Sequence, residues 1–178
     1  MAFAGQHQIG PAHGKLVVRT FREGIAAGVG HDLTLEITGW SADLTVDDDH
    51  TEVAATIDLG TLVVRTGTGG VKPLSDRDRR DIAHNARKAL DTDHGPTARF
   101  VSTTVTQTDG GGTIEGTLTL HGKDNPFTLQ VTETEPGHYR ATGTLRQTDY
   151  GIKPHTAFFG ALKLADQVEI EVEVAESA

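Results

Sequence analysis

Hydrophobic and polar residues alternate along several stretches of this chain, most clearly near its C-terminal end. Residues 168–174 read VEIEVEV, so that branched apolar side chains alternate with glutamates. Successive side chains of a β-strand point to opposite faces, and this spacing therefore predicts a strand with one buried and one wet face. A slip of one residue would bury the carboxylates, which fixes the inward face of the strand.

The same alternation predicts a hairpin over residues 113–131. Ile114, Leu118 and Leu120 share one parity, and Phe127, Leu129 and Val131 continue the pattern, as the sequence TIEGTLTLHGKDNPFTLQV shows. The residues between these runs, His121 to Pro126, are of types that accept turn dihedrals. We therefore expect two antiparallel strands joined by a turn over 121–126.

The N-terminal half of the chain predicts further strands, one of which changes phase. Lys15 to Phe21 is expected to form the first strand, and residues 53–59 form another after the polar turn Asp47 to His50. Between them, over Asp32 to Val46, the apolar residues are odd-numbered up to position 37 and even-numbered from position 40. A phase shift at Thr38–Gly39 predicts a β-bulge or sharp bend, a feature that curves long barrel strands. Together with the C-terminal segments, these strands point to a closed antiparallel barrel.

One helix is predicted near residues 76–90. Ser75 followed by Asp78 resembles a capping box, and a narrow apolar stripe follows, made of Ile82, Ala83, Ala86, Ala89 and Leu90. The opposite face carries five basic residues. We interpret it as a solvated face balanced by nearby aspartates, with a phosphate-binding patch as the alternative.

The C-terminal motifs resemble the YceI family of bacterial lipocalin-like proteins. The resemblance lies in G-x-L-T-L-H-G at Gly116 to Gly122, the proline and apolar strand after it, D-Y-G-I at Asp149 to Ile152, and GPTARFVS at Gly95 to Ser102. It implies an all-β fold, an eight-stranded antiparallel lipocalin-like barrel around an elongated apolar cavity, which in some members holds a polyisoprenoid or another long-chain amphiphile. The resemblance also implies a loop with short helical turns in the region where this chain is predicted to have a charged helix.

Composition and charge exclude several classes of function. The net charge of −9 disfavours nucleic acid or an anionic membrane surface as a partner. Without cysteine there is no disulfide and no thiolate nucleophile. The first residues contain no basic segment followed by an apolar run, so we expect no signal peptide, no transmembrane segment and a cytoplasmic location, unlike many YceI-like proteins. Residues 1–13 are expected to be a flexible arm and residues 14–178 a single barrel domain; a homodimer is left open.

The sequence offers little catalytic chemistry, and we assign no catalytic residue, no metal site and no cofactor. Its nine histidines form no HxH or HExxH pattern, and its serines lie outside nucleophile motifs. His31, His121 and His155 each lie at the end of a predicted strand and could meet at one rim. For His121 we favour the role of a turn residue that binds backbone.

The inward-facing residues then suggest a container for a hydrophobic small molecule. We expect the ligand-binding side chains to be Leu35, Ile37, Trp40, Ile57, Phe100, Leu118, Leu120, Phe127, Leu129, Tyr139, Leu145, Phe158, Phe159 and Ile170. Gly116, Ala141 and Gly143 share this parity and would leave room along one wall, while Tyr139, Tyr150 or a rim histidine would supply polar contacts.

Three functions follow from this reading. The first is non-enzymatic binding, carriage or sequestration of a polyisoprenoid or fatty-acyl lipid. The second is a ligand-free stress or interaction protein whose barrel is filled by side chains or by the helix, and the third, less favoured, is an enzyme that uses rim histidines and aspartates. Periodicity does not separate a filled barrel from a hollow one.

Overall fold

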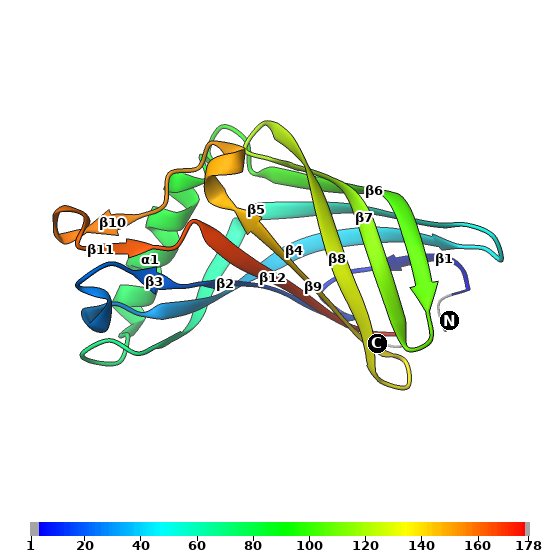
Figure 1. The fold of residues 1–178 in the computed structure, drawn as a ribbon, viewed down its shortest axis with the longest axis horizontal. Helices are drawn as coiled ribbons and strands as arrows, with labels where there is room; N and C mark the ends of the chain where they lie inside the picture. The colour runs from blue at the N-terminus through cyan, green and yellow to red at the C-terminus, as the bar shows by residue number, and fades with distance from the viewer. Residues whose placement is uncertain (1–3, 177–178) are drawn as a thin grey trace.

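The structure, a computed structural model that describes residues 4–176, is an elongated antiparallel β-barrel with a helix at one end (Figure 1). Its elements, in chain order, are β1 (Gly5–Ile9), β2 (Gly14–Thr20), β3 (Arg22–Glu23), η1 (Ala27–Val29), β4 (Asp32–Val46), β5 (Thr51–Thr68), α1 (Asp76–Ala89), β6 (Thr97–Thr108), β7 (Gly111–Leu120), β8 (Lys123–Glu135), β9 (His138–Arg146), η2 (Gln147–Tyr150), β10 (Thr156–Ala157), η3 (Phe158–Gly160), β11 (Leu162–Leu164) and β12 (Gln167–Ala175). This confirms the predicted fold class.

The barrel closes because β4 pairs on both sides. Among the described residues, eight strands follow one another around the wall in the order β4-β2-β12-β9-β8-β7-β6-β5, and β5 returns to pair with β4. That closing pair runs from Asp32 opposite Thr68 to Val46 opposite Thr51, nearly the full length of both strands. Every pairing between these strands is antiparallel, and closure pairs each of the eight strands with a neighbour on both sides over at least part of its length.

The N-terminal segment is more ordered than the sequence predicted. Residues 5–9, expected to belong to a flexible arm, form β1, which pairs with β4 from Gly5 opposite Val46 to Ile9 opposite Ala42. Strand β2 pairs with the other half of β4, so β1 and β2 together act as one interrupted strand alongside it. The buried side chain of Ile9 explains the order, because it anchors β1 to the core.

The alternation predicted for residues 168–174 is confirmed in β12. Its valines and isoleucine face the interior, and its glutamates lie on the outer surface between strands β2 and β9. There Glu171 accepts a hydrogen bond from Arg19 at 3.2 Å, and Arg140 pairs with Glu173 at 2.8 Å. The hydrogen bond to Glu173, with the nearby charge of Glu171, raises the pKa of Arg140.

The predicted bulge is confirmed, whereas the predicted hairpin turn is shorter than expected. Pairing of β4 with β5 shifts register between Ile37 and Gly39, where the sequence changes phase. The turn between β7 and β8 consists of His121 and Gly122 alone, both with positive φ, as a tight type I′ turn requires. Residues 123–126 belong to β8; Pro126 is accepted there because β8 pairs with β9 only from Gln130 onward.

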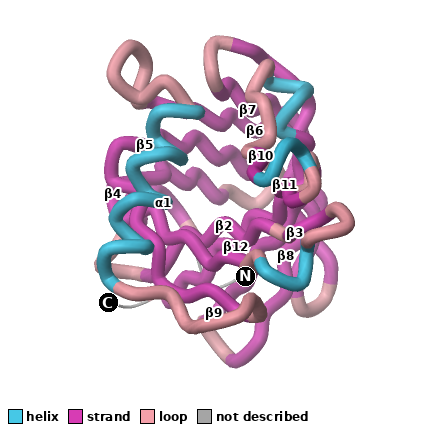
Figure 2. Tube along the Cα trace, turned by 90° about the vertical axis from the view of Figure 1, so that its left-hand side faces the viewer, coloured by secondary structure: helices cyan, strands magenta, loops and turns pink. Residues whose placement is uncertain are grey.

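The predicted helix is present and lies across one end of the barrel (Figure 2). The capping box is complete: the backbone N–H of Asp78 donates to Ser75 Oγ at 3.1 Å, and Ser75 N–H donates to the Asp78 carboxylate at 2.8 Å. The bonds from Ser75 lower the pKa of Asp78. Strands β3, β10 and β11 form a small second sheet at this end, which we call the helix-covered end. The far end is the one with the β4–β5 turn, residues 47–50.

Candidate functional site

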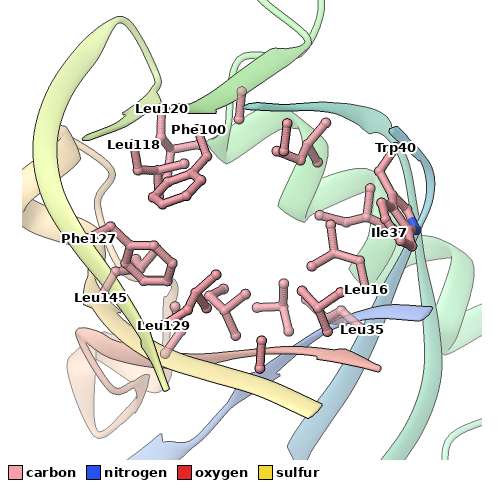
Figure 3. Close-up of a pocket in the computed structure, with 18 of the residues that line it drawn as sticks. Leu16, Leu35, Ile37, Trp40, Phe100, Leu118, Leu120, Phe127, Leu129 and Leu145 are labelled. Atoms are coloured by element: carbon pink, nitrogen blue, oxygen red, sulfur yellow. The ribbon is translucent and has the colours of Figure 1, made fainter. Parts of the chain in front are cut away.

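The barrel encloses a cavity of about 640 Å³. Its walls are the inward faces of the barrel strands, and the apolar side of α1 closes part of one end through Ile82, Ala86, Ala89 and Leu90. In Figure 3 the labelled side chains project from all sides toward a common open space. The barrel is therefore hollow, and the helix covers the cavity instead of filling it.

Most of the residues expected to face inward line this cavity. These are Leu35, Ile37, Trp40, Ile57, Phe100, Leu118, Leu120, Phe127, Leu129, Tyr139, Leu145 and Ile170. Their apolar character makes the interior suitable for hydrocarbon, since each buried CH₂ contributes about 0.8 kcal/mol without a directed partner.

Of the remaining two expected residues, one is exposed to solvent. Phe159 is wrong: its side chain is fully exposed, and its φ of 55° lies in the left-handed region. It sits in η3, where the chain turns between the very short strands β10 and β11, so alternation does not apply. The side chain of Phe158 lies outside the part that the structure describes.

The glycines of the wall have a different role from the one expected. The ring of Phe100 packs against Gly116, and the ring of Phe127 packs against Gly143, so the space above each glycine is occupied by an aromatic ring. The two rings also contact each other edge to face, with centroids 6.1 Å apart. Because the rings lie along the wall, they leave the middle of the barrel open.

Polar side chains along the cavity are confined to its two ends. The helix-covered end carries Thr20, His31, Asn85, Gln147, Lys153 and His155, and the far end carries Thr51, Thr106, Gln107, Thr113 and Tyr139. Among the described lining residues, Lys153 carries a full positive charge and no carboxylate is present. A bound amphiphile would therefore meet polar groups only at its ends.

Thr20 is the polar residue that the sequence analysis missed. It is 6% exposed, and its Oγ1 has no hydrogen-bond partner among residues 4–176. The alternation of β2 predicts its inward position, because Thr20 has the same parity as Leu16 and Val18, which both line the cavity.

The tyrosines expected to supply polar contacts are engaged elsewhere. Tyr139 lines the cavity, but its hydroxyl donates to Glu133 at 3.4 Å. Tyr150 is buried beneath the β7–β8 turn and does not line the cavity. Burial, and secondarily the charge of Asp149, raises its pKa.

Two of the three candidate rim histidines bind different backbone carbonyls, and His31 and His155 line the same end of the cavity. His31 Nε2 donates to the Lys72 carbonyl at 2.7 Å, and His121 Nδ1 donates to the Tyr150 carbonyl at 2.9 Å, in agreement with the turn role favoured for it. His155 lines the cavity at the helix-covered end. Within residues 4–176, no three histidine or acidic side chains are grouped so that they could hold a metal ion.

The charged face of α1 is largely balanced by its own aspartates. Arg77 pairs with Asp81 at 3.7 Å, and Arg79 pairs with Asp76 at 4.0 Å. Arg87 instead donates to the Leu62 carbonyl of β5 at 2.8 Å, which ties the helix to the barrel wall. In the part of the chain that the structure covers, no helix is long and apolar enough to cross a membrane.

Comparisons with known proteins agree with this architecture. Residues 7–175 match the family model described as the YceI-like domain. The structure resembles that of Burkholderia cenocepacia BcnA, with a TM-score of 0.66, 17% identity, and 93% of this chain and 98% of that chain covered. No curated protein matches the chain.

Two further solved structures share the fold. A polyisoprenoid binding domain from Saccharophagus degradans superposes with a TM-score of 0.57 and 13% identity over 97% of this chain and 99% of that chain. The YceI protein of Campylobacter jejuni gives a TM-score of 0.53 and 15% identity over 81% of this chain and 85% of that chain.

Proposed function

Because the chain belongs to the YceI-like family, we propose that it binds a long-chain amphiphile, a polyisoprenoid or a fatty-acyl lipid, inside its barrel and carries or sequesters it without catalysis. The observation that carries this proposal is the hollow, apolar cavity of about 640 Å³. A barrel filled by side chains, as in the ligand-free alternative, would have no such space.

The size of the cavity supports a single hydrocarbon chain as the ligand. An apolar protein cavity of about 150 Å³ accepts benzene, so the cavity here has room for roughly 25 carbon atoms. Ligand pockets for small molecules commonly measure about 300–1,000 Å³. A single hydrocarbon chain fits both this volume and the elongated shape of the barrel.

Similarity to the Saccharophagus domain supports the isoprenoid side of the proposal, since that protein is described as polyisoprenoid-binding. The cavity itself favours no one chain over another, because its wall is uniformly aliphatic and aromatic.

The proposal is tested by native mass spectrometry of freshly purified protein and by titration with saturated fatty acids of 8 to 24 carbons and with farnesol and geranylgeraniol. Trp40 is the single tryptophan of the chain and lines the cavity, so its fluorescence reports on occupancy. We expect a co-purified hydrophobic mass and an affinity that rises with chain length until the cavity is full.

The opposite result would be protein that is empty as purified and a Trp40 signal unchanged by every chain, with no displacement of a hydrophobic dye. It would exclude this function.

A further inference from the structure

The hydroxyl of Thr20 is an unpaired polar group inside an apolar cavity. The side chain lies at the end of β2, is 6% exposed, and lines the cavity. Its Oγ1 has no hydrogen-bond partner among the described residues. Buried polar groups are normally satisfied, and an unsatisfied one costs free energy that a suitably placed ligand atom would recover.

The backbone around Thr20 places other polar groups at the same end. Next to it, the Phe21 carbonyl accepts from Ala165 N–H at 2.7 Å, and the Ala165 carbonyl accepts from the Gln147 amide at 3.0 Å. Leu164 N–H in turn donates to the His155 carbonyl at 2.9 Å. The segment 164–165 thus connects Thr20 to Gln147 and to the strand entry that carries Lys153 and His155.

Lys153 adds charge to this end of the cavity. It takes part in none of the ion pairs between described residues. The cavity lining contains no carboxylate to balance its ammonium group. A cation with a flexible stem, at the same end of the cavity as a hydroxyl that can donate, is suited to an acidic oxygen group.

Among the described residues of the far end, no buried side-chain polar atom is left without a hydrogen-bond partner. There the Gln107 amide donates to Thr51 Oγ1 at 2.9 Å, so these two polar side chains are partners of each other. The two ends of the cavity therefore differ in how their polar groups are hydrogen-bonded.

We propose that the bound amphiphile has an acidic head, a carboxylate or a phosphate, that lies at the helix-covered end, where it accepts a hydrogen bond from Thr20 Oγ1 and faces the ammonium of Lys153. The hydrocarbon chain then extends toward Thr51 and Gln107 at the far end. This inference rests on the proposed function, because it assumes that a long-chain molecule occupies the cavity.

The test compares four probes with the same chain: myristate, tetradecyl phosphate, tetradecanol and tetradecane. Binding is followed by Trp40 fluorescence for the wild type, Thr20→Val and Lys153→Gln. Thr113→Val, a cavity-lining change at the far end, is the matched control. Thr20→Ser keeps the hydroxyl and tests for rescue.

We expect Thr20→Val to bind both acidic probes about tenfold more weakly than the wild type does, with unchanged affinity for tetradecane. Lys153→Gln should weaken binding of the acids and leave binding of tetradecanol unchanged, while Thr20→Ser should restore wild-type affinity. If the two variants lose more affinity for tetradecyl phosphate than for myristate, the head is assigned as a phosphate. If they lose more affinity for myristate, it is assigned as a carboxylate.

A second measurement separates this role from a structural one. Valine has the shape of threonine without the unpaired hydroxyl, so ligand-free Thr20→Val should unfold at the same urea concentration as the wild type or at a higher one. A hydroxyl needed for folding would give the opposite shift, and that result would overturn the inference.

Two binding results would also overturn it. The first is that Thr20→Val binds every probe as the wild type does, and the second is that Thr113→Val weakens binding of the acids as much as Thr20→Val does. Both leave the proposed function intact. Failure of the wild type to bind any probe, tetradecane included, would overturn the proposed function and this inference with it.

Discussion

The ring of Phe127 on β8 lies directly over the backbone of Gly143 on β9. A Cβ atom at position 143 would lie 2.7 Å from Cζ of the ring and 2.6 Å from the carbonyl oxygen of Thr128. Both distances are shorter than normal van der Waals contact. Glycine at this position therefore lets the ring pack against the strand, and the width of the cavity depends on that placement.

Gly143→Ala should destabilise the protein by about 1–3 kcal/mol, because the added methyl group overpacks the site between the ring and the strand. The displaced ring would also narrow the cavity, so affinity for long chains should fall. Urea unfolding and fatty-acid titration measure the two effects.

A double-mutant cycle with Phe127→Leu isolates the contact between ring and glycine. We expect Gly143→Ala to cost less in the Phe127→Leu background, with a remainder due to the Thr128 carbonyl. An equal cost in both backgrounds would assign the whole effect to the backbone and contradict the role given to the ring.

Ala141→Phe should block the cavity. Ala141 lines the wall on β9, where a larger side chain can grow into open space. Octadecanoate should bind at least tenfold more weakly, while octanoate, which needs less room, should keep most of its affinity. Thr142→Phe is the matched control, because Thr142 is next to Ala141 in β9 but is exposed on the outer face. Equal losses of affinity in the two variants would argue against a ligand inside the barrel.

The carboxylate of Asp166 should give the fold a pH dependence in acid. It accepts hydrogen bonds from Thr148 Oγ1 at 2.6 Å and from Thr148 N–H at 2.8 Å, and the side-chain bond is the main cause that lowers its pKa below 3.8. The folded state therefore binds this proton less readily than the unfolded state does. Its stabilising contribution is present above pH 3.8 and is lost as the pH falls through the lowered value.

Unfolding of the wild type and of Asp166→Asn between pH 6 and pH 2 measures this contribution. The stability difference between them should be largest near pH 6 and should shrink below pH 3.8. Asp48→Asn, in the exposed turn between β4 and β5, removes one charge without touching these hydrogen bonds and serves as the control. A difference that stays constant over the range would contradict the assignment.

Ser75→Ala should destabilise the first turn of α1. The change removes the side-chain acceptor for Asp78 N–H and should cost about 1 kcal/mol. Hydrogen exchange at residues 76–79 should accelerate while exchange in β12 stays slow. Ser75→Asp, which keeps an acceptor, should restore protection of the helix.

The features that were predictable from the sequence are those that depend on neighbouring residues. Strict alternation in β12, the phase change at Thr38–Gly39 and the Ser75 cap each express a rule that acts within a few positions, and the structure contains all three. The hairpin turn was predicted too long because Pro126 and its polar neighbours resemble turn residues. They belong to a strand because the first half of β8 pairs with β7 alone, which leaves its other side free to accept a proline.

The hollow interior depends on contacts between distant residues and could not be predicted. Whether Phe100 and Phe127 fill the barrel or line it depends on the glycines beneath them, which come from other strands. The inward position of Thr20, in contrast, could be predicted, because it follows from the alternation within β2 alone. Thr20 differs from the other inward residues of β2 in being small and polar, so the apolar pattern alone does not mark it as a lining residue.

Strand β1 begins and β12 ends at the far end of the barrel, away from α1 (Figure 1). A sensor surface or bead that holds the protein through either terminus would therefore face the same pole of the barrel. In both orientations the helix-covered end, with Thr20 and Lys153, would point into solution. Immobilisation through the N-terminal or the C-terminal side should thus give the same lipid-capture kinetics, whereas attachment through a residue of α1 should slow capture if ligands enter at that pole.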